Sequence, residues 1–281
     1  MNIGIVGLGL IGGSLGLDFR QHGHRVLGVS RKPQTCARAI ARGAVDEASV
    51  NLKLVQPADV VFICTPLAAM EATVIELIPH LSPATVLTDV GSVKGWVMAA
   101  IAPLWANFVG GHPMAGTAES GIEAALPNLF AGRPYVLTPT ETTPPEAVNR
   151  VAELIRSLQA HIYHCYPDEH DRAVAWISHL PVMVSTSLIA ACLHEDESGV
   201  LELAKALASS GFRDTSRVGG GNPELGVMMA RYNTAALVRS LYTFRDSLNH
   251  LITKVEQHDW QALEEMLERS QQARPVFVNH Q

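Results

Sequence analysis

Three glycines close to the N-terminus have the spacing of a phosphate-binding turn. Gly7, Gly9 and Gly12 fit G-x-G-x-x-G between an apolar run over 2–6 and a small-residue amphipathic run over 13–22. In a βαβ unit such glycines allow a tight turn, a close approach of a pyrophosphate, and close packing of helix on strand. The following helix also offers unpaired N–H groups to the phosphates. The pattern predicts a dinucleotide site; the alternative is a glycine-rich turn of another α/β protein.

The residues around this turn indicate which dinucleotide binds. Leu10 and Ile11, between the second and third glycines, are expected to contact it. An Asp or Glu after the second strand would hold the ribose hydroxyls of NAD, but this chain has Ser30, Arg31 and Lys32 there. A guanidinium can pair with a 2′-phosphate and stack on adenine. We therefore expect NADP rather than NAD; the alternative is that these cations form only a solvated turn.

A histidine enclosed by glycines and proline is the strongest candidate for proton transfer. His112 lies in F-V-G-G-H-P-M-A-G-T, residues 108–117, with two glycines before it and Pro113 after it. Imidazole is the side chain best suited to proton transfer near neutral pH. The sequence predicts a short strand that leads into a fixed loop carrying His112 as a catalytic residue. A structural histidine is the alternative.

Polar residues follow two further apolar runs of the first half. Thr65 and Pro66 follow one run, and Ser92 and Lys94 follow the run over 85–90. Because ligands bind at the carboxyl edge of a parallel sheet, Thr65 and Pro66 are expected to line the cofactor. Ser92 and Lys94 are expected to face the same crevice, although Ser92 could equally cap a helix.

Helical patterns replace strand patterns after about residue 164. The stretch 168–193 is predicted as a helix that Pro181 kinks, with His179 beside the kink as a ligand-contact candidate or a buried structural histidine. Arg213 and Arg217 lie in a predicted loop. Two arginines can receive a carboxylate, because a guanidinium pairs with it through two hydrogen bonds. The alternative is that one of them pairs with Asp214.

The stretch 224–257 is predicted as one long helix with apolar residues on more than one face. Its main stripe recurs at spacings of three and four residues: Leu237, Leu241, Phe244, Leu248, Leu251 and Val255. Such a helix must be covered on more than one side. We expect a homodimer through the helical half; a monomeric helix bundle is the alternative.

Composition excludes several classes of protein. The 281 residues are 47% hydrophobic and 17% charged, enough for a substantial core. A net charge of −6 without a long basic run argues against nucleic acid as the main partner. Four scattered cysteines indicate a reducing compartment, and no apolar run is judged long enough for a membrane span. We expect a cytoplasmic protein without a metal site, since His164, Cys165 and His170 match no zinc spacing.

The motifs together resemble the prephenate/arogenate (cyclohexadienyl) dehydrogenases of tyrosine biosynthesis. The resemblance spans nearly the whole chain. It rests on five motifs: G-L-G-L-I-G-G-S at 7–14, D-V-G-S-V-K at 89–94, G-G-H-P-M-A-G-T at 110–117, I-S-H-L-P at 177–181 and G-F-R-D-T-S-R at 211–217. It implies an α/β Rossmann-type N-terminal domain with a mostly parallel sheet over 1–164, followed by an all-α dimerisation domain over 165–281. The active site would lie between them, and a tyrosine-sensing regulatory domain is not expected.

The resemblance also implies a reaction and a set of roles. The reaction would be the NADP-dependent oxidative decarboxylation of L-arogenate to L-tyrosine, with hydride leaving ring carbon C4. His112 would take the proton of the C4 hydroxyl, and Ser92 would orient His112 through its other ring nitrogen. The substrate, a small cyclohexadienyl acid, would be bound by Arg217, with His179, Arg213 and Thr117 as further substrate contacts.

Other functions remain open from the sequence alone. Prephenate could replace arogenate, because the two differ only in a keto or amino group on the side chain. A β-hydroxyacid or imine reductase would need a lysine of the helical half, and Lys205 and Lys254 lie in no polar motif. An NADP-sensing binding protein without activity is a further alternative, which the set of Ser92, His112 and Arg217 disfavours.

Overall fold

The chain forms two compact units in a computed structural model that describes residues 1–117 and 119–278. The sheet unit comprises Met1–Val174 and Gly220–Asn233, and the helical unit comprises Ala175–Gly219 and Thr234–Gln281. The predicted domain boundary at 164/165 therefore differs from the division between compact units, which follows Val174. The helix Pro167–Val174 (α6) groups with the sheet.

The sheet unit is built on one eight-stranded sheet with the order β3-β2-β1-β4-β5-β6-β7-β8. Its strands are β1 Asn2–Val6, β2 Arg25–Val29, β3 Glu47–Ser49, β4 Val60–Ile63, β5 Val86–Asp89, β6 Phe108–Pro113, β7 Pro134–Thr138 and β8 His161–His164. Every pairing is parallel except that of β6 with β7. The predicted mostly parallel sheet is confirmed, and β1 lies at its topological switch point, between β2 and β4.

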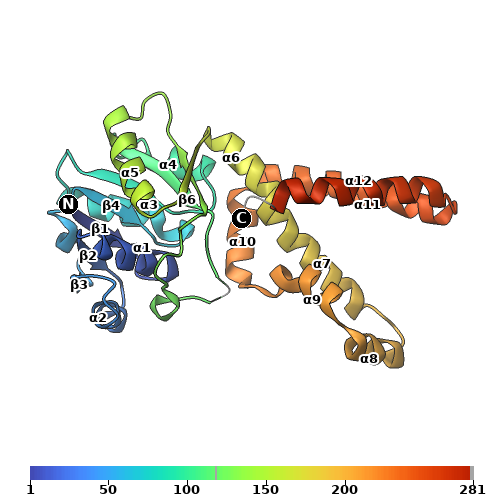
Figure 1. The fold of residues 1–281 in the computed structure, drawn as a ribbon. Helices are drawn as coiled ribbons and strands as arrows, with labels where there is room; N and C mark the ends of the chain where they lie inside the picture. The colour runs from blue at the N-terminus through green and yellow to red at the C-terminus, as the bar shows by residue number, and fades with distance from the viewer. Residues whose placement is uncertain (118, 279–281) are drawn as a thin grey trace. The chain divides into compact units, whose positions relative to one another are not determined.

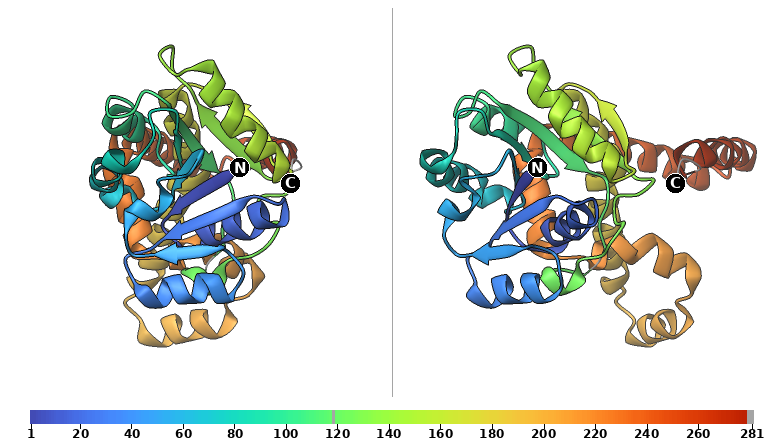
Figure 2. Two further views of the ribbon diagram at one scale, coloured as in Figure 1. Left: turned by 90° about the vertical axis from the view of Figure 1, so that its left-hand side faces the viewer. Right: turned by 60° about the vertical axis from the view of Figure 1, so that its left-hand side comes forward.

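Helices cover both faces of this sheet (Figures 1 and 2). They are α1 Leu10–Gln21, α2 Pro33–Ala41, α3 Leu67–Leu77, α4 Gly95–Ile101 and α5 Pro145–Ser157. Strand β4 shows why both faces are covered: Val60 and Phe62 join the core under α1, α2 and α5, whereas Val61 and Ile63 join the core under α3 and α4. A strand apolar at every position is buried on both sides, as in doubly wound folds.

His112 lies in strand β6 and not in a loop, which corrects the prediction from its glycine and proline neighbours. It is paired antiparallel with Val136 of β7. The strand continues past Gly110 and Gly111 because β7 supplies hydrogen-bond partners over the whole stretch Gly110–Pro113. The backbone of the candidate base is therefore fixed by a sheet.

The helical unit begins with a π-helical segment, Ala175–His179, and continues in α7, Leu180–Leu193. Pro181 lacks the N–H that a regular helix would bond to Ile177, so it accounts for an irregular turn at the predicted kink. The other helices are α8 Ser198–Leu207, α9 Ser210–Ser216, α11 Thr234–Glu256 and α12 Trp260–Val278. In Figure 1 α11 and α12 run side by side.

Two segments differ from their predicted form. The predicted loop 211–217 is mostly the helix α9, followed by a short 3₁₀ turn, Arg217–Gly220. Its hydroxyls bond back along the helix, as Thr215 Oγ1 donates to the carbonyl of Gly211 at 2.8 Å. The predicted long helix 224–257 is two helices, α10 (Pro223–Tyr232) and α11, which separate at Asn233.

Helix α10 belongs to the sheet unit by its contacts. The ring of Tyr232 lies 4.6 Å from that of Trp96 in α4, and Asn233 Nδ2 donates to the carbonyl of Asp171 at 2.8 Å. These two contacts hold the break between α10 and α11 against the sheet unit, which accounts for the end of the predicted long helix.

The expectation that no apolar stretch reaches the length of a membrane span is wrong. The continuous helical stretch Pro167–Leu193 is 27 residues long, and an 18-residue window within it has a mean hydropathy of 1.6, so it meets that criterion by length and composition. One such helix is weak evidence for a membrane, because core helices of globular proteins pass the same test.

Candidate functional site

The glycine turn after β1 has the geometry that its sequence predicts. Gly7 has φ +110°, and a Cβ on it would lie 2.5 Å from the carbonyl oxygen of Cys64. A Cβ on Gly12 would collide with the carbonyl oxygen of Gly7, whereas one on Gly9 would meet no atom of the described residues within 4 Å. The first and third glycines are thus required by the fold itself, and the second leaves open space in front of the backbone.

The start of α1 and the loop after β4 provide polar groups beside this space. Gly9 is the N-cap of α1 and makes no side-chain cap, so the first N–H groups, beginning at Leu10 and Ile11, are available to an anion. In the described part of the chain the buried hydroxyl of Thr65 has no hydrogen-bond partner. Pro66 is exposed at the N-cap of α3. Open space, helix N–H groups and an orphaned hydroxyl fit a bound dinucleotide.

The carboxyl end of β2 carries positive charge. Ser30 follows Val29 and is partly buried, and its N–H donates to the carbonyl of Ser49 at 3.2 Å. Arg31 and Lys32 are exposed, and neither forms an ion pair with any residue in the described ranges. This end of the strand therefore offers a hydroxyl and two cations to a ligand.

His112 is hydrogen-bonded to a second histidine of the sheet unit. Its Nδ1 lies 2.8 Å from Nε2 of His170, and Nδ1 of His170 lies 2.8 Å from Oδ1 of Asp171. His112 is partly exposed, whereas His170 and Asp171 are buried. Nδ1 of His112 is thus bonded to His170, and the role of Ser92 in orienting His112 stays a prediction.

A buried ion pair fixes the backbone next to His112. Lys94 Nζ bonds to the carboxylate of Asp89 and, at 2.6 Å, to the carbonyl of Gly111; the N–H of Gly111 donates to Asp89 Oδ1 at 3.0 Å. Lys94 is fully buried, so the prediction that it faces the crevice is wrong. Burial lowers the pKa of Lys94, and the carboxylates of Asp89 and Asp171 act in the opposite direction.

Two predicted residues of the sheet unit lie on partly or fully exposed loops. Ser92 follows β5 and is partly exposed, so it stays a candidate catalytic residue by its place at the carboxyl edge of the sheet. Thr117 is exposed, and its Oγ1 accepts from the N–H of Glu119 at 3.2 Å. Ser92 therefore stays predicted as a catalytic residue, and Thr117 stays predicted as a substrate contact.

The remaining predicted residues belong to the helical unit. His179 ends the π-helical segment and is buried. Arg213 is exposed and pairs with its neighbour Asp214 at 3.1 Å, which is the alternative that the sequence left open. Arg217 is exposed, begins the 3₁₀ turn and forms no ion pair with a described residue, so it is the better candidate for a substrate carboxylate.

The residues that sequence reasoning missed are His170 and Asp171. They stand together in D-E-H-D-R, a charged run at the start of an otherwise apolar helix. That contrast was the available signal. The pairing could not be derived from spacing, because His170 lies 58 residues from His112.

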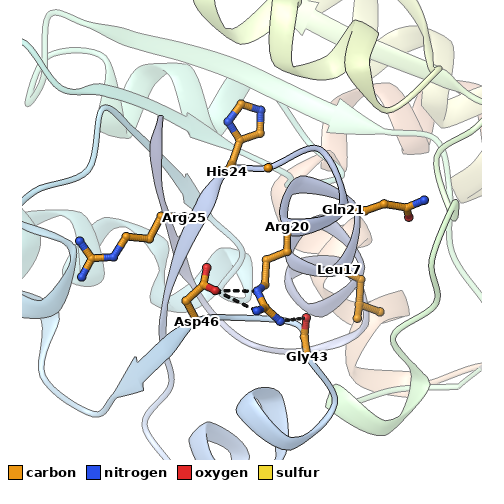
Figure 3. Close-up of a pocket in the computed structure, with 8 residues that line it drawn as sticks. Leu17, Arg20, Gln21, His24, Arg25, Gly43 and Asp46 are labelled. Carbon is orange, nitrogen blue, oxygen red and sulfur yellow. Dashed lines mark hydrogen bonds and ion pairs between the residues drawn. The ribbon is translucent and has the colours of Figure 1, made fainter.

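A separate polar pocket lies at the opposite edge of the sheet (Figure 3). It is lined by the end of α1 and the start of β2, where Arg20 bonds to the carboxylate of Asp46 at 2.9 Å and to the carbonyl of Gly43 at 2.7 Å. The amino end of a parallel strand is not where ligands bind in such sheets, and its arginine is already paired. We do not place the functional site there.

Known proteins match the chain over both units. Two family models match, described as "Prephenate dehydrogenase, nucleotide-binding domain" over residues 15–164 and "Prephenate dehydrogenase, dimerization domain" over residues 166–269. The prephenate dehydrogenase of Bacillus subtilis is 32% identical over 91% of this chain and 70% of its own length.

Two solved structures also match nearly the full length. Synechocystis arogenate dehydrogenase is 52% identical with a TM-score of 0.90, covering 99% of this chain and 100% of its own. Aquifex aeolicus prephenate dehydrogenase, in complex with hydroxyphenyl propionate and NAD⁺, is 28% identical with a TM-score of 0.93, covering 99% and 98%.

Proposed function

We propose that this chain, which belongs to the prephenate dehydrogenase family, oxidises L-arogenate with NADP to give L-tyrosine and CO₂. The resemblance predicted from the motifs is confirmed, and the chain is a dehydrogenase of the prephenate/arogenate type with a nucleotide-binding and a dimerisation domain. The preference for arogenate is supported by the 52% identity to an arogenate dehydrogenase along the whole chain. Prephenate is the alternative substrate.

The observation that carries the proposal is the fixed imidazole of His112. Strand β6 holds its backbone, and His170 holds one of its ring nitrogens. NADP, when bound at the glycine turn, supplies the acceptor for the hydride that leaves C4 of the substrate. His112 accepts the proton of the C4 hydroxyl as that oxygen gains carbonyl character. CO₂ then leaves C1, its electron pair restores aromaticity, and the proton returns to the phenolic oxygen.

Other residues bind the substrate in this proposal. Arg217 pairs with a substrate carboxylate, because it is an exposed guanidinium without an ion-pair partner among the described residues. Ser92 helps to orient His112, and His179, Arg213 and Thr117 contribute further contacts. Arg213 is the weakest of these, since Asp214 already pairs with it.

NADP is favoured over NAD by the residues after β2. No acidic residue follows Val29, and Arg31 and Lys32 are exposed cations at the position where the ribose 2′-phosphate of NADP lies in such folds. A carboxylate there would repel a 2′-phosphate, whereas a guanidinium binds it through charge-assisted hydrogen bonds.

A homodimer in the cytoplasm completes the proposal. The helical unit exposes large apolar side chains on α11, among them Val238, Tyr242, Leu248 and Ile252, each more than a third exposed. Apolar surface of this extent marks a protein interface, and a second copy of the same chain is the occupant that the dimerisation-domain match favours.

A lysine-dependent reductase, the other enzyme class considered, is disfavoured by the structure. Both candidate lysines of the helical unit are paired: Lys205 Nζ bonds to Glu202 at 2.6 Å and Lys254 Nζ to Asp259 at 2.9 Å. An ammonium held by a neighbouring carboxylate is poorly suited to polarise a substrate.

One assay tests the activity and its specificity together. Production of reduced cofactor is followed over a range of arogenate or prephenate concentrations, with NADP or NAD, and with a 3-hydroxy acid as the substrate of the alternative class. We expect the arogenate and NADP pair to give the highest kcat/KM. His112→Asn should lower kcat by about 10²–10⁴ while the Kd for NADP stays near that of the wild type. Turnover close to wild type in that variant would show that His112 is not the base.

The cofactor preference has its own test. Arg31→Ala should raise the Kd for NADP by about 10- to 100-fold, the loss of one charge-assisted interaction, and leave that for NAD within about twofold. Arg150→Ala, an exposed arginine on α5, is the matched control and should change neither. Equal losses for NADP and NAD would remove the role of Arg31.

A further inference from the structure

Three side chains of the sheet unit form a hydrogen-bonded chain that ends at His112. The rings of His112 and His170 stand nearly perpendicular, with an interplanar angle of 72° and centroids 5.0 Å apart. Their nitrogens bond at 2.8 Å, and the second nitrogen of His170 bonds to Asp171 at 2.8 Å. His170 is 2% exposed, so it does not meet solvent as a free imidazole.

The carboxylate of Asp171 determines which ring nitrogens of His170 and His112 carry protons. An ionised carboxylate only accepts hydrogen bonds, so Nδ1 of His170 carries a proton and donates it to Asp171. Neutral His170 then has its lone pair on Nε2, which must accept from Nδ1–H of His112. It follows that the lone pair of His112 is on Nε2.

We propose that His170 is a positioning residue that holds His112 in the tautomer with its proton on Nδ1 and its basic lone pair on Nε2. The inference rests on the proposed role of His112 as the base that accepts the substrate's hydroxyl proton. Without His170 the imidazole could rotate or adopt the other tautomer, and its lone pair would then point away from the substrate. Once His112 is protonated, the Nδ1–H bond to His170 and the charge of Asp171 stabilise the imidazolium.

Asp171 is itself held by backbone groups. Its Oδ1 accepts from the N–H of Lys94 at 2.7 Å and its Oδ2 from the N–H of Gly95 at 2.8 Å. A Cβ at position 95 would lie 2.9 Å from Oδ2, so glycine is what allows this approach. The carbonyl of Asp171 accepts from Asn233. The acceptor for His170 is therefore set by the fold and cannot turn away.

The other ionisable groups near His112 and His170 do not replace Asp171 as the hydrogen-bond acceptor. Lys94 and Asp89 pair with each other in the core. The segment that carries His170 adds Cys165, Asp168 and Glu169, of which Asp168 pairs with Arg172 at 3.3 Å and Glu169 accepts from the N–H of Tyr166 at 2.9 Å. Burial and nearby carboxylates raise the pKa of Cys165.

The kinetic test compares two substitutions of His170 in the full-length enzyme. His170→Leu removes the acceptor, and kcat should fall by about 10²-fold while KM for substrate and cofactor changes by less than about threefold. His170→Gln offers an amide oxygen to Nδ1–H of His112 and should recover kcat to within about tenfold of the wild type. His164→Leu, an exposed histidine on β8, is the control and should behave as the wild type.

The pH profile separates positioning from a merely structural role. In His170→Leu the imidazolium of His112 loses its acceptor, so the acid limb of the kcat/KM profile should move to lower pH. A structural defect would lower the amount of active enzyme, and the Tm, without moving that limb.

A measurement on the wild-type enzyme does not depend on how the variants fold. Long-range ¹H–¹⁵N spectra of the histidine rings, with His112 identified by the signal missing from His112→Asn, should show its proton on Nδ1. A proton on Nε2 would overturn the inference, as would an unchanged kcat in His170→Leu. If His112→Asn is inactive while His170→Leu is not, only this inference fails. If His112→Asn stays active, the proposed function fails first.

Discussion

The sheet unit holds its candidate base, and the helical unit its candidate arginines, in opposite ways. In the sheet unit the imidazole of His112 is tied to two buried residues, and the neighbouring backbone is tied to a buried ion pair. In the helical unit the candidate arginines are exposed, and Arg213 pairs only with its own neighbour. The candidate base and its hydrogen-bond partners thus lie within one unit, whereas the arginines proposed to bind a substrate carboxylate are long, solvent-exposed side chains of the other.

The largest expected effect on stability comes from breaking the buried ion pair of the sheet unit. An exposed ion pair of the helical unit serves as the comparison. Lys94→Met leaves the carboxylate of Asp89 buried without its cation and should lower the free energy of unfolding by about 3–5 kcal/mol. Lys205→Met breaks the exposed pair with Glu202 and should cost less than about 1 kcal/mol. Urea denaturation followed by circular dichroism measures both. Equal costs would contradict the contrast between a fixed and an exposed set of charges.

The glycine turn allows a matched pair of substitutions within the sheet unit. Gly12→Ala places a Cβ against the carbonyl of Gly7 and should destabilise the fold by about 3 kcal/mol. Gly9→Ala meets no atom within 4 Å among residues 1–117 and 119–278, so stability should fall by less than about 1 kcal/mol while the Kd for NADP rises at least about tenfold. Thermal unfolding without cofactor, and titration with NADP, separate the two effects. A Gly9→Ala variant that binds NADP normally would place the pyrophosphate elsewhere.

The third and smaller expected effect is on the dimerisation of the helical unit. Leu248 on α11 is 45% exposed, and Leu248→Glu should weaken dimerisation by about 2 kcal/mol, or about 30-fold in Kd. Asn249→Glu, an exposed residue on the same helix, is the matched control. Light scattering over a range of concentrations gives the Kd. A chain that is monomeric before substitution would show that this apolar surface has another role.

Much of the fold could be predicted because it depends on local patterns. The apolar runs, the glycine turn and the loss of strand patterns after 164 indicated a mostly parallel sheet followed by helices. Strand β8, H-I-Y-H, gave no such signal, since it is an edge strand with three exposed residues of four. The break between α10 and α11 was also missed, because it depends on tertiary contacts of Asn233 and Tyr232.

The candidate site was predicted where one residue type implied one chemistry. His112 and the glycines were found in this way, and their roles stay predictions. The partner of His112 and the burial of Lys94 were not found, because both depend on residues distant in the sequence. Lys94 in particular follows a strand at the binding edge, yet it turns inward to the carboxylate of Asp89, a position that periodicity does not distinguish from an outward one.

The path of the polypeptide limits how the enzyme can be divided into fragments. Because α10 belongs to the sheet unit but lies between two segments of the helical unit, the polypeptide passes from one unit to the other three times. A fragment cut at residue 164 or 174 would leave Trp96 without the ring of Tyr232, and Asp171 would be missing or would lose its bond to Asn233. Neither half can therefore be obtained intact by a single truncation, and evolution could exchange one half for another only by keeping α10 in place.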